Sequence, residues 1–228
     1  MKEMHHRVKN NLQIVVSLLK MQTNYLKDEF TLNAFGEISN RIQAISLIHQ
    51  RLYRVENTTE IQMRDYINEL ISYLKESAVD TSTIQFQVNV TDINMEISQS
   101  VPVGLMINEM ITNSIKYAFV GRTNGLITVS FQQEDQKIIL TVADNGVGLP
   151  NDFDSNNHSM GMQLIKTLTE QLEGTLTIEN KDGVYFCVDG WSSLKELLAG
   201  KSGVSPFLPQ KLSCPNSAPF SRTRKPSC

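Results

Sequence analysis

The stretch Asn108-Glu-Met-Ile-Thr-Asn-Ser-Ile-Lys-Tyr-Ala118 decides the fold, and it is typical of the middle of a helix. Four of its residues recur at i, i+4, i+7 and i+8 and are expected to share one helix face: Glu109, Asn113, Lys116 and Tyr117. On that face an amide oxygen can ligate Mg²⁺, an ammonium can neutralise phosphate, and a carboxylate can take a proton or hold a water. Taken alone, such a stripe is more often only a solvated surface, so its meaning depends on the rest of the chain.

Two glycine-containing segments follow this helix. An apolar strand runs into Asp144-Asn-Gly-Val-Gly148, and Gly161 opens the next helix after a polar stretch. The carboxylate of Asp144 can accept a hydrogen bond from the exocyclic amine of adenine. Gly146 and Gly148 allow a sharp turn beside a planar base, and Gly161 leaves room for phosphate at a helix N-terminus. By itself, however, Asp-Asn-Gly is more often a simple tight turn.

Together the three segments resemble the N, G1 and G2 boxes of the Bergerat-fold ATPases, the superfamily of gyrase, Hsp90 and the sensor histidine kinases. The resemblance implies ATP and Mg²⁺ as cofactors, with Asn113 as the metal ligand, Lys116 on phosphate and Tyr117 lining the nucleotide pocket. It also implies that residues 149–160 form a lid over ATP. Glu109 stands where the ATPase members keep a water-activating glutamate, which leaves water and another nucleophile both open.

The N-terminal helix favours another nucleophile. Met4-His-His-Arg-Val-Lys-Asn-Asn-Leu-Gln-Ile14 resembles the phosphoacceptor box of the His-Arg-x-Lys-Asn branch of histidine kinases, which is related to the HWE kinases. The resemblance implies that His6 attacks the γ-phosphorus of ATP, while Asn10, one turn on, orients His6 or a water. His5 points about 100° away and is expected to have no role. The implied function is autophosphorylation on His6, followed by transfer to an aspartate of a response-regulator receiver domain.

Two departures from the family pattern matter. Asn108 and Thr141-Val-Ala143 stand where the HWE kinases proper carry a histidine and a Trp-x-Glu, so the chain resembles the neighbouring branch. The last glycine box reads Gly183-Val184 where Gly-Thr is usual, so a hydroxyl on the nucleotide is missing. The alternatives are a Bergerat-fold ATPase or anti-sigma-type serine kinase, or a nucleotide-binding dimeric scaffold without transfer. No sensory domain precedes the acceptor box, which predicts a fragment or a kinase driven by a partner.

Hydrophobic periodicity predicts an α+β fold, in which a two-helix hairpin precedes a two-layer sandwich with a mixed sheet. Residues 1–58 form the dimerisation and phosphoacceptor hairpin, residues 59–188 the ATP-binding domain, and residues 189–228, which hold five of the seven prolines, a disordered or non-family tail. A lone hairpin leaves apolar stripes uncovered, which predicts a homodimer through the N-terminal helices. The predicted helices are 4–26, 29–56, 60–79, 101–119 (with Pro102 in the first turn) and 160–172, and the predicted strands are 83–90, 95–97, 125–133, 136–144, 174–180 and 183–188.

Composition sets the remaining limits. The net charge is −3 and the excess of lysine and arginine lies in residues 189–228, so no nucleic-acid surface is expected on the folded part. No apolar run approaches the roughly 18 residues of a membrane span. The three cysteines lack CxxC spacing and are expected to be free thiols of a reducing compartment, which predicts a cytoplasmic protein.

Overall fold

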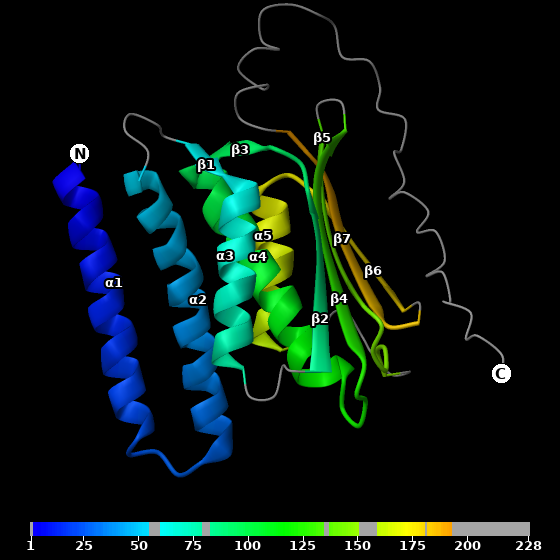
Figure 1. The fold of residues 1–228 in the computed structure, drawn as a ribbon, viewed down its shortest axis with the longest axis horizontal. Helices are drawn as coiled ribbons and strands as arrows, with labels where there is room; N and C mark the ends of the chain where they lie inside the picture. The colour runs from blue at the N-terminus through cyan, green and yellow to red at the C-terminus, as the bar shows by residue number, and fades with distance from the viewer. Residues whose placement is uncertain are drawn as a thin grey trace, which may run out of the picture.

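The chain folds into an N-terminal helical hairpin and an α/β sandwich (Figure 1). A computed structural model describes residues 2–54, 60–78, 83–134, 137–150, 159–180 and 182–192. The side chains of residues 2–6, 9, 53 and 54 lie outside this description. The predicted tail from residue 193 onward and most of the predicted lid lie outside it too.

The hairpin consists of α1 (Lys2–Thr23) and α2 (Glu29–Arg54), which lie antiparallel as predicted. Asp28 caps the second helix, since its Oδ2 accepts hydrogen bonds from the backbone N–H of Thr31 at 2.8 Å and from its hydroxyl at 2.6 Å. These bonds, together with the hydrogen-bonded turns that follow α1, fix the reversal of the chain.

The sheet of the sandwich has five strands in the order β2-β4-β5-β7-β6. β2 and β4 are parallel and the other pairs are antiparallel, as the predicted mixed sheet requires. The strands are β2 (Ile84–Val90), β4 (Gly125–Glu134), β5 (Lys137–Asp144), β6 (Thr175–Asn180) and β7 (Val184–Trp191). β7 continues three residues past the predicted end at 188, because Trp191 is buried against Phe131 of the neighbouring core.

Three helices cover one face of the sheet: α3 (Met63–Ser77), α4 (Ile97–Asn113) and α5 (Met160–Gln171) (Figure 1). A two-stranded ribbon of β1 (Glu60–Gln62) and β3 (Asn94–Glu96) lies at one end. The sequence analysis predicted β3 but assigned β1 to the helix that follows it.

The central helix differs from its prediction at both ends. α4 begins four residues early, at Ile97, so the expectation that Pro102 lies in the first turn is wrong and Pro102 is inside the helix. Pro102 cannot donate to the carbonyl of Ser98, but Ser98 is exposed and water can satisfy that oxygen. At its other end α4 gives way to a π-helical turn at Ser114–Ala118.

The hairpin shares its core with the sandwich. Ala44, Leu47 and Ile48 of α2 are buried in the same hydrophobic cluster as the sheet and its helices. The Tyr66 hydroxyl of α3 donates to the carbonyl of Ala44 at 3.3 Å. The sandwich therefore covers α2 around residues 44–48 without a second hairpin, whereas Ile38 is 39% exposed.

The outer helix α1 remains largely uncovered. Figure 1 shows α1 on the far side of α2 from the sandwich. Its outward stripe of Ile14, Leu18 and Met21 is 57%, 54% and 58% exposed. An apolar stripe of this kind is expected to find a partner.

The structure bears on the state of one cysteine and on the search for membrane-spanning helices. Cys187, fully buried in β7, is disulfide-bonded, so the expectation of three free thiols is wrong for this residue. Among the described helices, none is both long enough and apolar enough to span a bilayer.

Candidate functional site

A cavity of about 380 Å³ lies where the carboxyl end of β5, the end of α4 and the beginning of α5 meet. This volume falls within the range of small-molecule pockets. Four residues assigned to nucleotide binding from the sequence line it: Asn113, Tyr117, Asp144 and Gly148. Apolar surface comes from Ala118, Val147, Leu149, Met162, Val184 and Phe186. The cavity therefore combines apolar walls with a few polar groups, which suits an aromatic base.

Asp144 is the polar anchor of the cavity and is only 2% exposed. Its Oδ1 accepts hydrogen bonds from the backbone N–H groups of Gly146 at 2.9 Å and Val184 at 3.1 Å. Its Oδ2 accepts one hydrogen bond, from the Ser114 hydroxyl at 2.8 Å. Because a carboxylate oxygen accepts about two hydrogen bonds, Oδ1 is saturated and Oδ2 keeps one acceptor position for a ligand amine.

Ser114 is a site residue that the sequence analysis missed. It begins the π-helical turn directly after Asn113, and its hydroxyl is buried against Asp144. Val184 lacks the hydroxyl that the family pattern discussed above has at this position. Val184 still contributes its backbone N–H and an apolar wall.

The glycines of the turn after β5 are required by close packing. A Cβ on Gly146 would lie 2.4 Å from the Cβ and the carbonyl oxygen of Ala118. Gly148 has φ +78°, and a Cβ there would lie 2.2 Å from the Asn180 side chain. The turn is further held by the Val147 N–H, which donates to the Ala118 carbonyl at 2.9 Å. The turn after β5 therefore fits closely against the end of the central helix.

One end of the cavity lies at the beginning of α5. Ser159 precedes this helix without a side-chain cap, so the first turn presents uncapped N–H groups that favour an anion. A Cβ on Gly161 would lie 2.7 Å from Oε2 of Glu109. Glu109 therefore lies beside the glycine that the sequence analysis assigns to phosphate.

Asn113 fits the role of a Mg²⁺ ligand. Its amide lines the cavity and, within the described residues, forms no hydrogen bond with another group. Among those residues there is no cluster of three or more histidine, cysteine, aspartate or glutamate side chains. A single amide suits Mg²⁺, which takes few protein ligands and completes its shell with phosphate and water.

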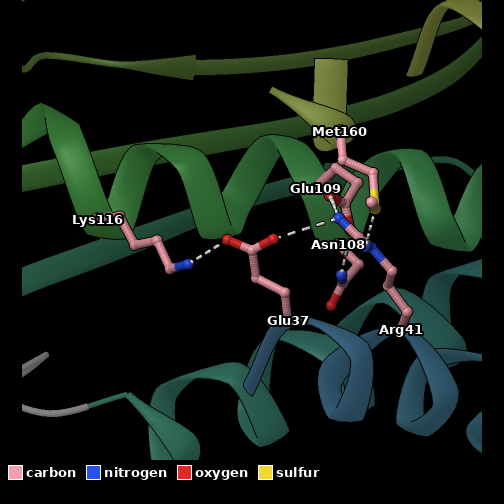
Figure 2. A network of polar contacts seen from close by, with 6 residues as sticks. All are labelled: Glu37, Arg41, Asn108, Glu109, Lys116 and Met160. Atoms are coloured by element: carbon pink, nitrogen blue, oxygen red, sulfur yellow. Dashed lines mark hydrogen bonds and ion pairs between the residues drawn. The ribbon is translucent and has the colours of Figure 1, made fainter. Parts of the chain in front are cut away.

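Glu109 is held by a residue of the hairpin (Figure 2). Arg41 of α2 donates from Nε to Oε1 at 2.9 Å and from an Nη to Oε2 at 2.7 Å. The two side chains are 13% and 7% exposed. Asn108 also donates to Oε1, at 3.0 Å. The hydrogen bonds to Glu109 raise the pKa of Arg41, although burial acts in the opposite direction.

Lys116 is held by the same helix of the hairpin. Its ammonium lies 2.6 Å from Oε1 of Glu37, whose Oε2 lies 3.5 Å from Arg41 (Figure 2). Glu37 therefore joins Lys116 and Arg41 into one network with Glu109. The sequence analysis missed Glu37 and Arg41, whose only signal is a pair of opposite charges at i, i+4 on α2.

The helix face predicted from the sequence is thus divided between two neighbours. Asn113 and Tyr117 line the cavity, with Tyr117 62% exposed, whereas Glu109 and Lys116 face α2. Two features explain why these four residues do not share one face. The α-helical hydrogen bonding ends at Asn113, and the opposite charges on α2 attract Lys116 and Glu109.

His6 and Asn10 lie on α1, one turn apart. The side chain of His6 is outside the described residues, and Asn10 is exposed. Because α2 lies between α1 and the sandwich, the structure does not bring Asn10 or the helix of His6 to the cavity (Figure 1). Residues 151–158 of the predicted lid, including His158, also fall outside the description.

Comparison with known families matches both parts of the chain. Residues 3–78 match the family described as "Histidine kinase". Residues 98–191 match the family described as "Histidine kinase-, DNA gyrase B-, and HSP90-like ATPase". The second match covers Asp144 and every predicted nucleotide residue.

Curated relatives and solved structures agree with this assignment. Sensor histidine kinase PdtaS of Mycolicibacterium smegmatis is 29% identical over 77% of this chain and 36% of its own length. Blue-light-activated histidine kinase 2 of Erythrobacter litoralis is 26% identical over 77% of this chain and 52% of its own length. The chain therefore spans between about a third and a half of these relatives.

The fold is shared with solved structures from Erythrobacter litoralis. The histidine kinase domain of the EL346 blue-light activated histidine kinase has a TM-score of 0.63 at 22% identity, covering 85% of this chain and 90% of that domain. A longer structure of EL346 has a TM-score of 0.68 at 19% identity, covering 86% of this chain and 61% of that one.

Proposed function

This chain belongs to the sensor histidine kinases, and from that premise we propose that it is an ATP-dependent protein histidine kinase that phosphorylates itself on His6. The observation that carries the proposal is the buried Asp144 carboxylate, which keeps one free acceptor position in a cavity of about 380 Å³. An exocyclic amine on adenine would fill that position, whereas the carbonyl at the same place in guanine would repel the carboxylate.

The triphosphate would extend from the adenine cavity toward Gly161 and the N-terminus of α5. Asn113 would ligate Mg²⁺, which supplies positive charge to the phosphates. Lys116 would reach phosphate once released from Glu37, to which it is now paired at 2.6 Å. Tyr117, Gly146 and Gly148 would shape the pocket around the base, as the close packing of the two glycines supports.

In the chemical step, an imidazole nitrogen of His6 attacks the γ-phosphorus of ATP. The bond to the β–γ bridging oxygen breaks and ADP leaves with the electron pair. Asn10 would orient the imidazole. Phosphohistidine then passes its phosphoryl group to an aspartate of a response-regulator receiver domain. We place this chemistry in the cytoplasm because ATP is available there. The cysteine content does not support this placement, because Cys187 is disulfide-bonded.

His6 must approach ATP from another position than the one described, because α2 separates α1 from the cavity. Either the hairpin moves or the partner subunit of a dimer supplies the histidine. The exposed stripe on α1 supports a homodimer through the N-terminal helices. We keep the division into a hairpin at 1–58, a catalytic domain that begins at 59 and a C-terminal tail. The predicted boundary at 188/189 moves to the end of β7, so the catalytic domain reaches Trp191.

Two other functions remain as competitors. An ATPase or an anti-sigma-type serine kinase would use Glu109 to activate its nucleophile, but both oxygens of Glu109 are engaged by Arg41 in this arrangement. A nucleotide-binding scaffold would bind ATP without transfer. The free amide of Asn113 beside the cavity favours a metal-dependent reaction over simple binding.

Incubation with γ-labelled ATP and Mg²⁺ distinguishes the three candidate functions. A kinase retains label on the protein, an ATPase releases labelled phosphate, and a scaffold does neither while still binding nucleotide. Asp144→Asn should abolish labelling, because the new amide repels the adenine amine. Labelling of Asp144→Asn at the wild-type level would contradict the proposed nucleotide site.

A further inference from the structure

We propose that Arg41 of the hairpin determines the reaction specificity of the site by withholding Glu109 from water, so that ATP is not hydrolysed while the hairpin is docked. The inference rests on the proposed ATP site but not on the identity of the phosphorylated histidine. It assigns a positioning role to a residue outside the ATP-binding fold.

Glu109 is placed where it could act as a general base for ATP hydrolysis. Its Oε2 would lie 2.7 Å from a Cβ on Gly161, the glycine at the beginning of α5 that the sequence analysis assigns to phosphate. A carboxylate at that place can accept a proton from a water that attacks the γ-phosphorus. The site therefore holds the group that hydrolysis needs, although transfer to a histidine is its proposed task.

Arg41 binds both oxygens of that carboxylate. Its planar guanidinium donates to both oxygens, at 2.9 Å and 2.7 Å, which is the geometry that binds a carboxylate most strongly. Asn108 adds a third donor at 3.0 Å. Oε1 therefore accepts two hydrogen bonds and Oε2 one, and the guanidinium pairs with the negative charge on Oε2, the oxygen that faces Gly161 and that a catalytic water would have to approach.

Attachment of the hairpin to the sandwich does not by itself explain the contacts of Arg41. Leu47 and Ile48 already bury α2 against the sandwich, and Arg51 pairs with Asp65 at 3.0 Å and Glu69 at 2.8 Å on α3. Arg41 instead reaches Glu109, the acidic side chain that a Cβ on Gly161 would meet. Its guanidinium also donates to the Met160 sulfur at 3.5 Å, at the beginning of α5.

The reaction that Arg41 suppresses is the hydrolysis of ATP to ADP and phosphate. Water oxygen attacks the γ-phosphorus, the bond to the β–γ bridging oxygen breaks, and ADP leaves with the electron pair. Glu109 takes the proton released by the water. Replacing Arg41 by a short side chain opens space for that water and frees the carboxylate to act as the base.

The test measures phosphate release from ATP and Mg²⁺ by the full chain in a His6→Gln background, so that turnover of phosphohistidine cannot contribute. We expect Arg41→Ala to raise phosphate release at least about a hundredfold, the lower end of typical general acid–base effects. Adding Glu109→Gln should remove the gain. Arg41→Lys should give a smaller gain than Arg41→Ala, because one ammonium keeps the positive charge but cannot bind both oxygens of Glu109. Arg51→Ala is the matched control, since it breaks an ion pair of the same helix with α3 but leaves Glu109 bound.

The proposal is overturned if Arg41→Ala binds a non-hydrolysable ATP analogue normally yet releases no more phosphate than its parent. It is also overturned if the gain survives Glu109→Gln, or if Arg51→Ala produces the same gain. Should Arg41→Ala not fold, Arg41→Gln is the second variant, with a smaller gain expected and the same Glu109 dependence. Labelling of His6 in the wild type is measured separately, so failure of the proposed kinase function remains distinguishable from failure of this inference.

Discussion

At the scale of single residues, the site is built from a few buried polar groups whose hydrogen-bonding capacity is almost used up. Asp144 illustrates this, because three of its acceptor positions are filled by Ser114, Gly146 and Val184. The remaining position decides what the cavity binds. Ser114 donates to Oδ2 and thereby orients the carboxylate.

Ser114→Ala should therefore weaken ATP binding. Losing a hydroxyl that donates to a carboxylate costs about 1.4 kcal/mol here, which is about tenfold in Kd. Calorimetric titration with a non-hydrolysable ATP analogue and Mg²⁺ measures the change. Ser98→Ala, at an exposed position of α4, is the control and should bind like the wild type. An unchanged Kd in Ser114→Ala would show that the hydroxyl has no part in the site.

At the scale of elements, hydrophobic periodicity predicted the major helices and strands to within a few residues. It missed β1, whose three residues form a strand only because they pair with β3. It placed the start of α4 too late because Pro102 normally marks a first turn, whereas an exposed carbonyl at Ser98 allows it inside a helix. Long periodic segments are recognisable locally, but short strands and helix ends depend on their neighbours.

The residues of the candidate site also fall into two groups, those that could be predicted from the local sequence and those that could not. Asp144 and the glycines were recognisable because their chemistry is local to a turn. Arg41 was not, because its partner Glu109 is 68 residues away in the sequence and nothing in the local sequence links the two. The residues that control the site through the hairpin are therefore visible only in the folded chain.

Two helix glycines should respond to the same substitution with opposite signs. Gly36→Ala in α2 adds a methyl group that meets nothing within 4 Å, so it should stabilise the protein by up to about 1 kcal/mol through helix propensity. Gly104→Ala in α4 places a Cβ 2.1 Å from the Tyr66 hydroxyl oxygen and 2.8 Å from its ring carbon, so it should destabilise by about 1–3 kcal/mol. Urea unfolding followed by circular dichroism measures both, and a change of the same sign would contradict this packing.

At the scale of the whole molecule, the hairpin has two different faces. α2 is buried in the core of the sandwich and holds Glu109 and Lys116, whereas α1 presents an apolar stripe outward. The first face links the position of the hairpin to the chemistry of the site. The second is suited to bind another copy of the chain.

Leu18→Glu should convert a dimer into a monomer. A charge at the centre of the exposed α1 stripe would have to be desolvated in a helical bundle, which is strongly unfavourable. Light scattering coupled to size-exclusion chromatography gives the mass. Gln13→Glu adds the same charge on the flank of α1 and should leave the dimer intact. A wild-type chain that is monomeric at micromolar concentration would contradict the homodimer.

The most direct test of the histidine kinase assignment is the chemical stability of the label that γ-labelled ATP leaves on the protein. Phosphohistidine is lost in acid and survives base, because protonation makes imidazole a good leaving group. We predict an acid-labile, base-stable label that disappears in His6→Gln and persists in His5→Gln. An acid-stable label that is unchanged in His6→Gln would contradict the account, because the nucleophile would then lie outside the N-terminal helix's phosphoacceptor box.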